Sequence, residues 1–228
     1  MTYENILHGR FLKRLNRFTA MVEIDGREVG CHVKNTGRLR ELLLPGADCL
    51  LSKSFDPTRK TKFDLISVYR EDGALVNIDS LAPNRVAAEY LPVLFPDLTQ
   101  YRREYAFGES RLDFYAERAS GKKLLMEVKG VTLEQDGVCA FPDAPTLRGS
   151  KHLRGLADAA REGYGAYVLF VIQMENVRFL RPNDATDPDF AAALRQAAAA
   201  GVRVLAHSCA VMPDSMTITG PVPVELQK

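Results

Sequence analysis

Two acidic residues and a lysine in the middle of the chain have the types and the spacing of a hydrolytic metal site. They are Asp113, Glu127 and Lys129. Carboxylate oxygens are the ligands that Mg²⁺ and Mn²⁺ prefer, and the backbone carbonyl of Val128 is a natural third protein ligand. A divalent ion bound there would activate water, and Lys129 would stabilise developing negative charge. The pattern therefore predicts the chemistry of phosphodiester hydrolysis.

The elements that carry these residues are predicted to form a β-hairpin. Polar and apolar residues alternate in 110–117 and again in 123–132, with a polar loop between them. Asp113 and Glu127 are each seven positions from Ser120, the centre of that loop. In a hairpin symmetric about this residue, the two carboxylates lie opposite each other on the same face. Opposed like charges destabilise a sheet unless a cation lies between them, so this geometry favours a bound metal.

The same residues allow a plainer interpretation. A Glu-X-Lys pair on a half-exposed strand is often a solvated ion pair that contributes little. Leu125 and Val131 share the predicted face of Glu127 and Lys129, which places the charges in a partly apolar surface. Spacing alone does not choose between the two interpretations.

Beyond residue 80 the pattern predicts an α/β domain with a mixed sheet, over residues 81–228. Asn84 is expected to cap a short helix that ends near residue 91, and Ser150 to cap a helix that ends near 162. Asp187 with Pro188 is expected to begin a third helix. The expected strands are 101–107, 110–117, 123–132, 166–172 and 202–206.

Residues 1–80 are predicted to form a small all-β domain. Five short strands are expected, at 18–24, 27–33, 48–52, 63–69 and 74–78, with Asp-Gly turns in two of the connections. This arrangement favours an oligonucleotide-binding (OB) type five-stranded barrel, although an SH3-like barrel gives a similar pattern. Phe11, Phe18 and Phe55 are types that stack on bases, but in a small barrel they are expected in the core.

The charge distribution favours a polyanionic partner. Residues 1–62 hold 12 Lys and Arg against 7 Asp and Glu, although the whole chain has a formal net charge of only +1. Basic residues that follow or precede turns can line a nucleic-acid backbone, or can form an ordinary solvated surface. The expected nucleic-acid contacts in the barrel are Arg10, Lys13, Arg14, Arg17, Lys34, Asn35 and Arg38, and those in the second domain are Arg111, Arg148, Lys151 and His152.

Helix electrostatics supports the expected nucleic-acid contacts near residue 150. Arg148, Lys151 and His152 lie near the predicted start of a helix, where positive charge opposes the helix dipole. A bound phosphate would reverse the sign of that interaction.

Other features limit the class of protein. The four cysteines have no CxxC spacing, which argues against a zinc ribbon and a disulfide framework. The first ten residues do not resemble a secretory signal, and the longest apolar run, 164–172, is too short to span a bilayer. We expect a reduced, cytoplasmic protein with no membrane partner. The oligomeric state stays open, with a homodimer among the alternatives.

Several motifs together resemble a known family. Arg111-Leu-Asp113-Phe followed by Glu127-Val-Lys129 resembles the catalytic hairpin of PD-(D/E)XK nucleases, with Leu112 where a proline often stands. The whole chain is similar to the sugar fermentation stimulation protein A (SfsA) family. The further stretches that carry this similarity are Asn16-Arg-Phe18, His32-Val-Lys-Asn-Thr-Gly-Arg38, Pro83-Asn-Arg85, Phe141-Pro-Asp-Ala144 and Arg148-Gly-Ser-Lys-His-Leu153.

The resemblance implies an OB-like N-terminal domain, a restriction-endonuclease-like C-terminal domain and DNA binding linked to regulation of sugar (maltose) metabolism. It implies a site at Asp113, Glu127 and Lys129 that uses Mg²⁺ or Mn²⁺. Three functions stay open: a metal-dependent nuclease, a non-catalytic DNA-binding transcriptional regulator, and a hydrolase of small phosphate esters. No groove-inserting helix is evident, so no base preference is predicted.

Overall fold

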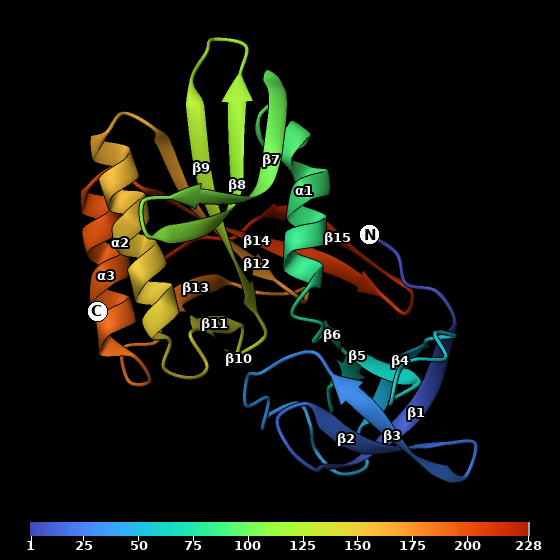
Figure 1. Cartoon of the computed structure of the whole chain (residues 1–228). Coiled ribbons are helices and arrows are strands. Elements are labelled where there is room, and N and C mark those ends of the chain that lie inside the picture. The colour runs from blue at the N-terminus through green and yellow to red at the C-terminus, as the bar shows by residue number, and fades with distance from the viewer. Residues whose placement is uncertain (228) are drawn as a thin grey trace.

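Short twisted strands wrap the first part of the chain into a barrel. The computed structural model describes residues 1–227, and its N-terminal lobe lies at the lower right of Figure 1. The strands are β1 (Ile6–Arg14), β2 (Thr19–Ile24), β3 (Arg27–Val33), β4 (Asp48–Lys53), β5 (Phe63–Tyr69) and β6 (Leu75–Asn77). They pair in the order β3-β2-β1-β4-β5-β6, and an additional parallel pairing of β3 with β5 closes a five-stranded ring. This closure removes the free edges of the sheet.

The OB-like barrel is confirmed, but its strands differ from the expected set. The expectation omitted β1, and β6 extends the sheet outside the ring. β1 was hard to recognise because most of its residues are partly exposed and carry no clear alternation; Phe11 is its one fully buried side chain. Phe11 belongs to the core as predicted, with 1% exposure. Phe18 and Phe55 do not: they are 49% and 70% exposed, so the prediction of core positions was wrong for both.

The second lobe is a six-stranded mixed sheet with helices on both faces. Its helices are α1 (Ala82–Leu94), α2 (Leu147–Arg161) and α3 (Pro188–Ala199). The strands pair in the order β15-β14-β12-β9-β8-β7, and their bounds are β7 (Leu98–Phe107), β8 (Ser110–Arg118), β9 (Lys123–Val131), β12 (Gly165–Ile172), β14 (Arg203–Met212) and β15 (Ser215–Pro221). Figure 1 shows α1 on one side of this sheet and the pair α2 and α3 on the other. The predicted α/β architecture is confirmed.

A core cluster lies on each face of the sheet. Leu153, Leu156 and Phe170 belong to the cluster under α2, and Val86, Leu91 and Phe114 to the cluster under α1. The central strand β12 is buried almost throughout, as expected for a strand covered on both faces. β9 pairs in parallel with β12 along its whole length, from Leu124 opposite Gly165 to Val131 opposite Ile172. This pairing fixes the position of Glu127 and Lys129.

Two predicted helix starts were wrong. α1 begins at Ala82 with a proline in its first turn, so Asn84 lies inside the helix instead of capping it. α2 is capped by Thr146, whose side chain accepts a hydrogen bond from the Gly149 N–H at 3.0 Å. Ser150 is therefore an interior residue of the first turn. The cap at Asp187 is confirmed by its 2.9 Å hydrogen bond from the Phe190 N–H.

Several short elements were not expected. β10 (Glu134–Gln135), β11 (Val138–Phe141) and β13 (Phe179–Pro182) form a separate three-stranded sheet, and β15 adds an outer hairpin to β14. The three strands of the separate sheet have only two to four residues, which give too little alternation to be recognised in a sequence, whereas β15 has seven. No helix within residues 1–227 is long and apolar enough to cross a membrane.

A buried polar network joins the two lobes. The Gln173 amide nitrogen donates to the Asn77 carbonyl at 3.0 Å, to Asn77 Oδ1 at 2.8 Å and to the Asp79 carbonyl at 3.2 Å. Lys34 of the barrel forms an ion pair with Asp79 at 3.3 Å, and Arg70 pairs with Glu134. Gln173, Asn77 and Asp79 are each 1% exposed. Breaking such a satisfied buried network is costly, so it fixes the angle between the lobes.

Candidate active site

The β8–β9 hairpin has the register expected from its loop. Phe114 pairs with Met126, and Tyr115 pairs with Leu125. Each pair is symmetric about Ser120, as predicted. The regular pairing includes Phe114 but not the preceding residue, Asp113.

Asp113 departs from the simple alternation. Leu112 and Tyr115 lie in the same core cluster, although alternation places them on opposite faces. Glu104, on the neighbouring strand β7, has a left-handed backbone (φ 56°) between the residues that pair with Leu112 and Phe114. The expectation that regular alternation places Asp113 opposite Glu127 on the same face was therefore wrong. Its carboxylate turns toward β9 and α1.

Two donors hold the Asp113 carboxylate. The Val128 N–H donates to Oδ2 at 2.7 Å, and the Asn84 side chain of α1 donates to Oδ1 at 2.8 Å. The side chain thus replaces a backbone partner of the hairpin ladder. This links Asp113 directly to the strand that carries Glu127.

Glu127 is buried, with 3% exposure, and its two oxygens have different surroundings. Oε1 accepts a 2.6 Å hydrogen bond from Lys129 Nζ and a second one from His152 Nδ1. Oε2 has no hydrogen-bond partner in the part of the chain that the structure describes. A buried carboxylate oxygen without a partner is energetically unfavourable, and a cation would satisfy it.

The two carboxylates differ in proton affinity. Burial and the negative charge of Glu127 raise the pKa of Asp113 to about 6, against its ordinary value of 3.8. Burial alone would also raise the pKa of Glu127, but hydrogen bonds from His152 and Lys129 outweigh it and bring that pKa below its usual range. The negative charge of Glu127 is therefore felt at Asp113.

The hydrogen bonds of His152 determine its tautomer. Arg148 Nε donates to His152 Nε2 at 3.3 Å, so Nε2 accepts and Nδ1 carries the proton. Nδ1 then donates to Glu127 Oε1. His152 is 5% exposed, and so lies in the interior instead of at the surface where a phosphate contact was expected. It is an orienting group for Glu127.

The oxygens of this region are of the type that hard divalent cations prefer. A cation bound here would have Glu127 Oε2, the Asp113 carboxylate and the Val128 backbone carbonyl as candidate protein ligands. Within residues 1–227 there is no group of three or more His, Cys, Asp or Glu side chains arranged to hold a metal. Two carboxylates with few protein ligands suit Mg²⁺ or Mn²⁺, which keep several water ligands.

The expected nucleic-acid contacts do not form one cluster. Arg14 is largely used within the barrel, because its guanidinium donates to the carbonyls of Asn16, Arg17, Asn35, Gly37 and Arg38. It holds the 35–38 loop in shape, and the Arg38 N–H in turn donates to Asp143 of the second lobe at 3.0 Å.

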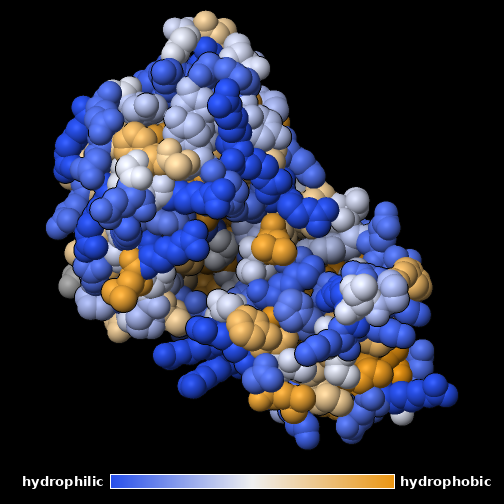
Figure 2. Space-filling view, viewed as in Figure 1, coloured by the Kyte–Doolittle hydropathy of each residue, from blue (hydrophilic) through white to orange (hydrophobic). Residues whose placement is uncertain are grey.

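The remaining contacts are spread over both lobes. Lys34 is half-buried and forms ion pairs with Asp64 and Asp79, both at 3.3 Å. Arg10 and Arg111 are exposed beside single carboxylates, and Lys13, Arg17 and Arg38 are exposed. Lys151 is exposed near Glu109, and Arg148 is exposed beside His152. Figure 2 shows an indentation between the two lobes with hydrophilic side chains on both sides of it.

Two residues around the site were not predicted in their observed roles. Asn84 was expected as a helix cap and as part of the Pro83-Asn-Arg85 stretch, and the structure makes it a partner of Asp113. Arg103 of β7 lies over the Phe114 ring, 5.8 Å from its centroid, and donates to the Asn84 carbonyl at 3.5 Å. No local motif marks Arg103, since its position depends on the pairing of β7 with β8.

Comparisons with known proteins agree over nearly the whole chain. The SfsA N-terminal OB domain matches residues 12–78, and the sugar fermentation stimulation protein RE domain matches residues 81–215. The chain is 52% identical over 217 residues to a sugar fermentation stimulation protein homolog of Desulfitobacterium hafniense, covering 95% of this chain and 94% of that protein. It is 50% identical over 220 residues to the homolog of Clostridium beijerinckii, covering 96% of each.

A solved structure has the same fold. The structure of Pyrococcus furiosus SfsA in complex with Ca²⁺ superposes with a TM-score of 0.87 at 29% identity, covering 99% of this chain and 98% of that one. Both domains and their arrangement are therefore shared. The chain belongs to the sugar fermentation stimulation protein (SfsA) family.

Proposed function

We propose that this protein is a DNA-binding, Mg²⁺- or Mn²⁺-dependent phosphodiesterase whose site consists of Asp113, Glu127 and Lys129. One observation carries the proposal: Glu127 Oε2 is buried without a partner, within residues 1–227, beside a second carboxylate whose pKa is raised to about 6. An ordinary surface ion pair has neither property. Pyrococcus furiosus SfsA forms a complex with Ca²⁺ in its solved structure, which supports a site for a hard cation in the family.

Asp113, Glu127 and the Val128 carbonyl would hold the ion. When bound, the ion would lower the pKa of a water ligand and polarise the phosphate. Asn84 and the Val128 N–H keep Asp113 turned toward β9, and His152 keeps Glu127 in one rotamer with Oε2 free. Lys129, only 15% exposed at its side chain, places an ammonium group next to Glu127, where it stabilises negative charge on a phosphate oxygen.

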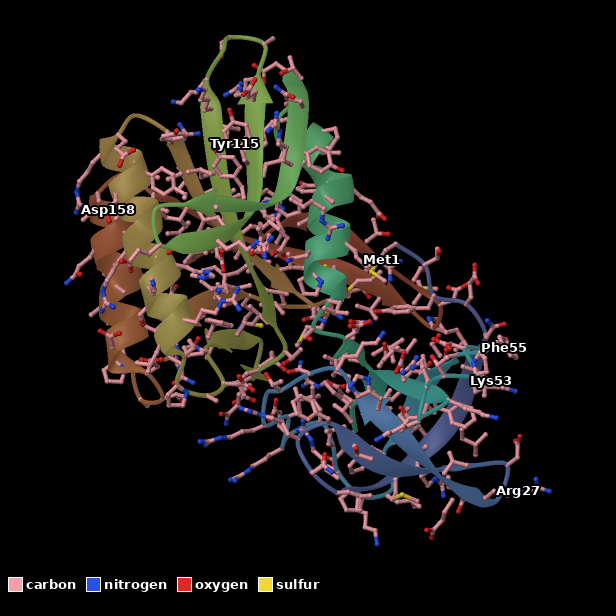
Figure 3. All side chains as sticks on the ribbon, in the orientation of Figure 1. Met1, Arg27, Lys53, Phe55, Tyr115 and Asp158 are labelled. Atoms are coloured by element: carbon pink, nitrogen blue, oxygen red, sulfur yellow. The ribbon has the colours of Figure 1, made fainter. Side chains whose placement is uncertain are left out.

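Cleavage of DNA tests the proposal. Supercoiled plasmid and single-stranded circular DNA are incubated with wild type in Mg²⁺ or Mn²⁺. We expect cleavage that falls at least about 100-fold in Asp113→Ala and Glu127→Ala. Asp158→Ala is the matched control, since Asp158 is an exposed carboxylate on the outer side of α2 (Figure 3). Cleavage that survives Asp113→Ala excludes this site.

A second candidate function is a DNA-binding regulator that uses the nuclease-like domain only for binding. The name of the relatives, sugar fermentation stimulation protein homolog, favours a link to sugar metabolism. In that case the protein binds DNA with a steep salt dependence but cleaves neither substrate in either metal. Absence of DNA binding at low salt excludes both functions and favours a small phosphate ester as substrate.

A further inference from the structure

Each carboxylate of the site is connected to an arginine through one neutral residue. Asp113 binds the side chain of Asn84, and the backbone carbonyl of Asn84 accepts from Arg103. On the other side, Glu127 binds His152, and His152 accepts from Arg148. Arg103 comes from β7 and Arg148 from the first turn of α2. The two arginines thus approach the site from different elements.

The neutral residues prevent direct ion pairs. An arginine beside a carboxylate would normally form a bidentate pair with it and neutralise both groups. Here Asn84 and His152 occupy the carboxylates, and neither Arg103 nor Arg148 contacts a carboxylate within residues 1–227. Glu127 Oε2 has no partner among the described residues and stays available to a cation, and no carboxylate neutralises either guanidinium group there.

The position of Arg148 has an energetic cost that an anion would remove. Arg148 lies in the first turn of α2, which has no acidic residue, so its charge opposes the helix dipole. Two other exposed arginines of α2 have acidic partners: Arg154 pairs with Asp189, and Arg161 lies 2.6 Å from Asp158. Arg103 and Arg148 lack such a partner among the described residues. Unlike other arginines without an acidic partner, such as Arg181, each is hydrogen-bonded to a residue that binds a carboxylate of the site.

We infer that Arg103 and Arg148 bind the backbone phosphates on either side of the phosphate at Asp113 and Glu127. This rests on the proposed function and gives the substrate class. The ligand is a polynucleotide strand with several consecutive phosphates, and a phosphate monoester or mononucleotide reaches only one of the three positions. We call Arg103 and Arg148 the flanking arginines.

DNA binding against salt tests the role of the flanking arginines independently of cleavage. A fluorescent oligonucleotide is titrated with wild type, Arg103→Gln and Arg148→Gln at several NaCl concentrations. Each substitution is expected to weaken binding about 3- to 10-fold near 0.1 M salt. Each should also lower the slope of log K against log salt by about 0.7–0.9. Arg103→Lys and Arg148→Lys should restore the slope, because they keep the charge.

The matched control is Arg161→Gln, on the same helix as Arg148 but paired with Asp158. It should leave the affinity and the slope within twofold of wild type. Slopes for Arg103→Gln and Arg148→Gln that match that of Arg161→Gln overturn the inference, as does a wild type that binds no oligonucleotide. If the wild type and the variants show the expected slopes but the wild type does not cleave DNA, the role of the flanking arginines is supported and the proposed catalysis is wrong.

The length of the substrate gives a second test. With wild type, affinity should rise steeply from two to about six nucleotides, because each added phosphate reaches another cation. The double variant Arg103→Gln, Arg148→Gln should show a much flatter dependence. Equal length dependence in the two proteins overturns the inference, and circular dichroism of each variant confirms that it is folded.

Discussion

The Asp113 carboxylate replaces a backbone group in the β8–β9 ladder, because its Oδ2 accepts the Val128 N–H at 2.7 Å. The hairpin therefore opens at the point where the site lies. The opening brings one carboxylate between two strands and close to the other, at a cost that follows from the raised pKa of Asp113. Sites that depart from regular secondary structure in this way sacrifice stability for function.

That cost predicts the effect of Asp113→Asn. The native state binds the Asp113 proton more tightly than the unfolded state, since its pKa is about 6 against 3.8. The penalty is therefore absent at low pH and is complete above about pH 7. In EDTA at pH 8 we expect the variant to be more stable than wild type by about 1–2 kcal/mol, or roughly 2–8 °C in Tm. The advantage should shrink between pH 6 and pH 4. Thermal melts of both proteins at pH 8 and pH 4 check this prediction. A difference in Tm that is the same at both pH values would contradict it.

His152→Ala is expected to weaken the binding of Mn²⁺. Without the Nδ1 donor, Glu127 loses the contact that fixes its rotamer. Loss of such an orienting hydrogen bond typically costs about 10- to 100-fold in metal affinity. His152→Asn is the control, since its amide nitrogen lies near the position of Nδ1. Isothermal titration with Mn²⁺ measures both. An unchanged Kd in His152→Ala would show that His152 has only a packing role.

His207 is expected to reduce stability in acid. It is 5% exposed, its Nδ1 has no partner among the described residues, and burial lowers its pKa below the ordinary 6.5. The unfolded state therefore binds the proton more tightly, and stability falls as the pH drops below about 6.5. His207→Phe keeps an aromatic ring beside Tyr90, whose centroid is 5.2 Å away. Urea unfolding at pH 5 and pH 8 should show a smaller loss in the variant. An equal loss of stability between pH 8 and pH 5 in wild type and in His207→Phe would exclude His207 as the cause.

Gly130→Ala should destabilise the protein and reduce any activity. A Cβ at this position would lie 2.5 Å from Gln173 Oε1 and 2.7 Å from Pro83 Cγ. The expected cost is about 1–3 kcal/mol, because both neighbours are buried and held in place. Gly30→Ala is a matched control in a strand of the barrel, where a Cβ meets nothing within 4 Å. Urea unfolding compares them. Equal effects would mean that Gly130 is not needed for close packing.

Much of the fold was predictable because its signals are local. The turns Asp25-Gly26 and Asp72-Gly73 mark two hairpins, and the apolar run of β12 marks a buried strand. The loop centred on Ser120 indicated the register of β8 and β9. The helical Gly155, which costs stability in isolation, is explained only by packing: a Cβ there would lie 3.1 Å from Ser110 Oγ of β8.

The site was less predictable because its geometry depends on distant segments. The types of Asp113, Glu127 and Lys129 suggested the chemistry, but alternation did not reveal the turn of Asp113 away from its expected face. The roles of Asn84 and Arg103 depend on how α1 and β7 pack beside β8. His152 was expected at the surface because Ser150 was predicted to cap its helix, whereas the cap is Thr146, four residues earlier.

The Gln173 network has a consequence for the choice of DNA. Its three hydrogen bonds across the lobe junction hold the barrel and the α/β domain at one angle. A duplex that contacts both lobes must then adopt the curvature of the protein. Flexible steps such as TA and CA bend more easily than stiff A-tracts. Binding would therefore discriminate among sequences through the stiffness of the duplex, without any side chain reading a base.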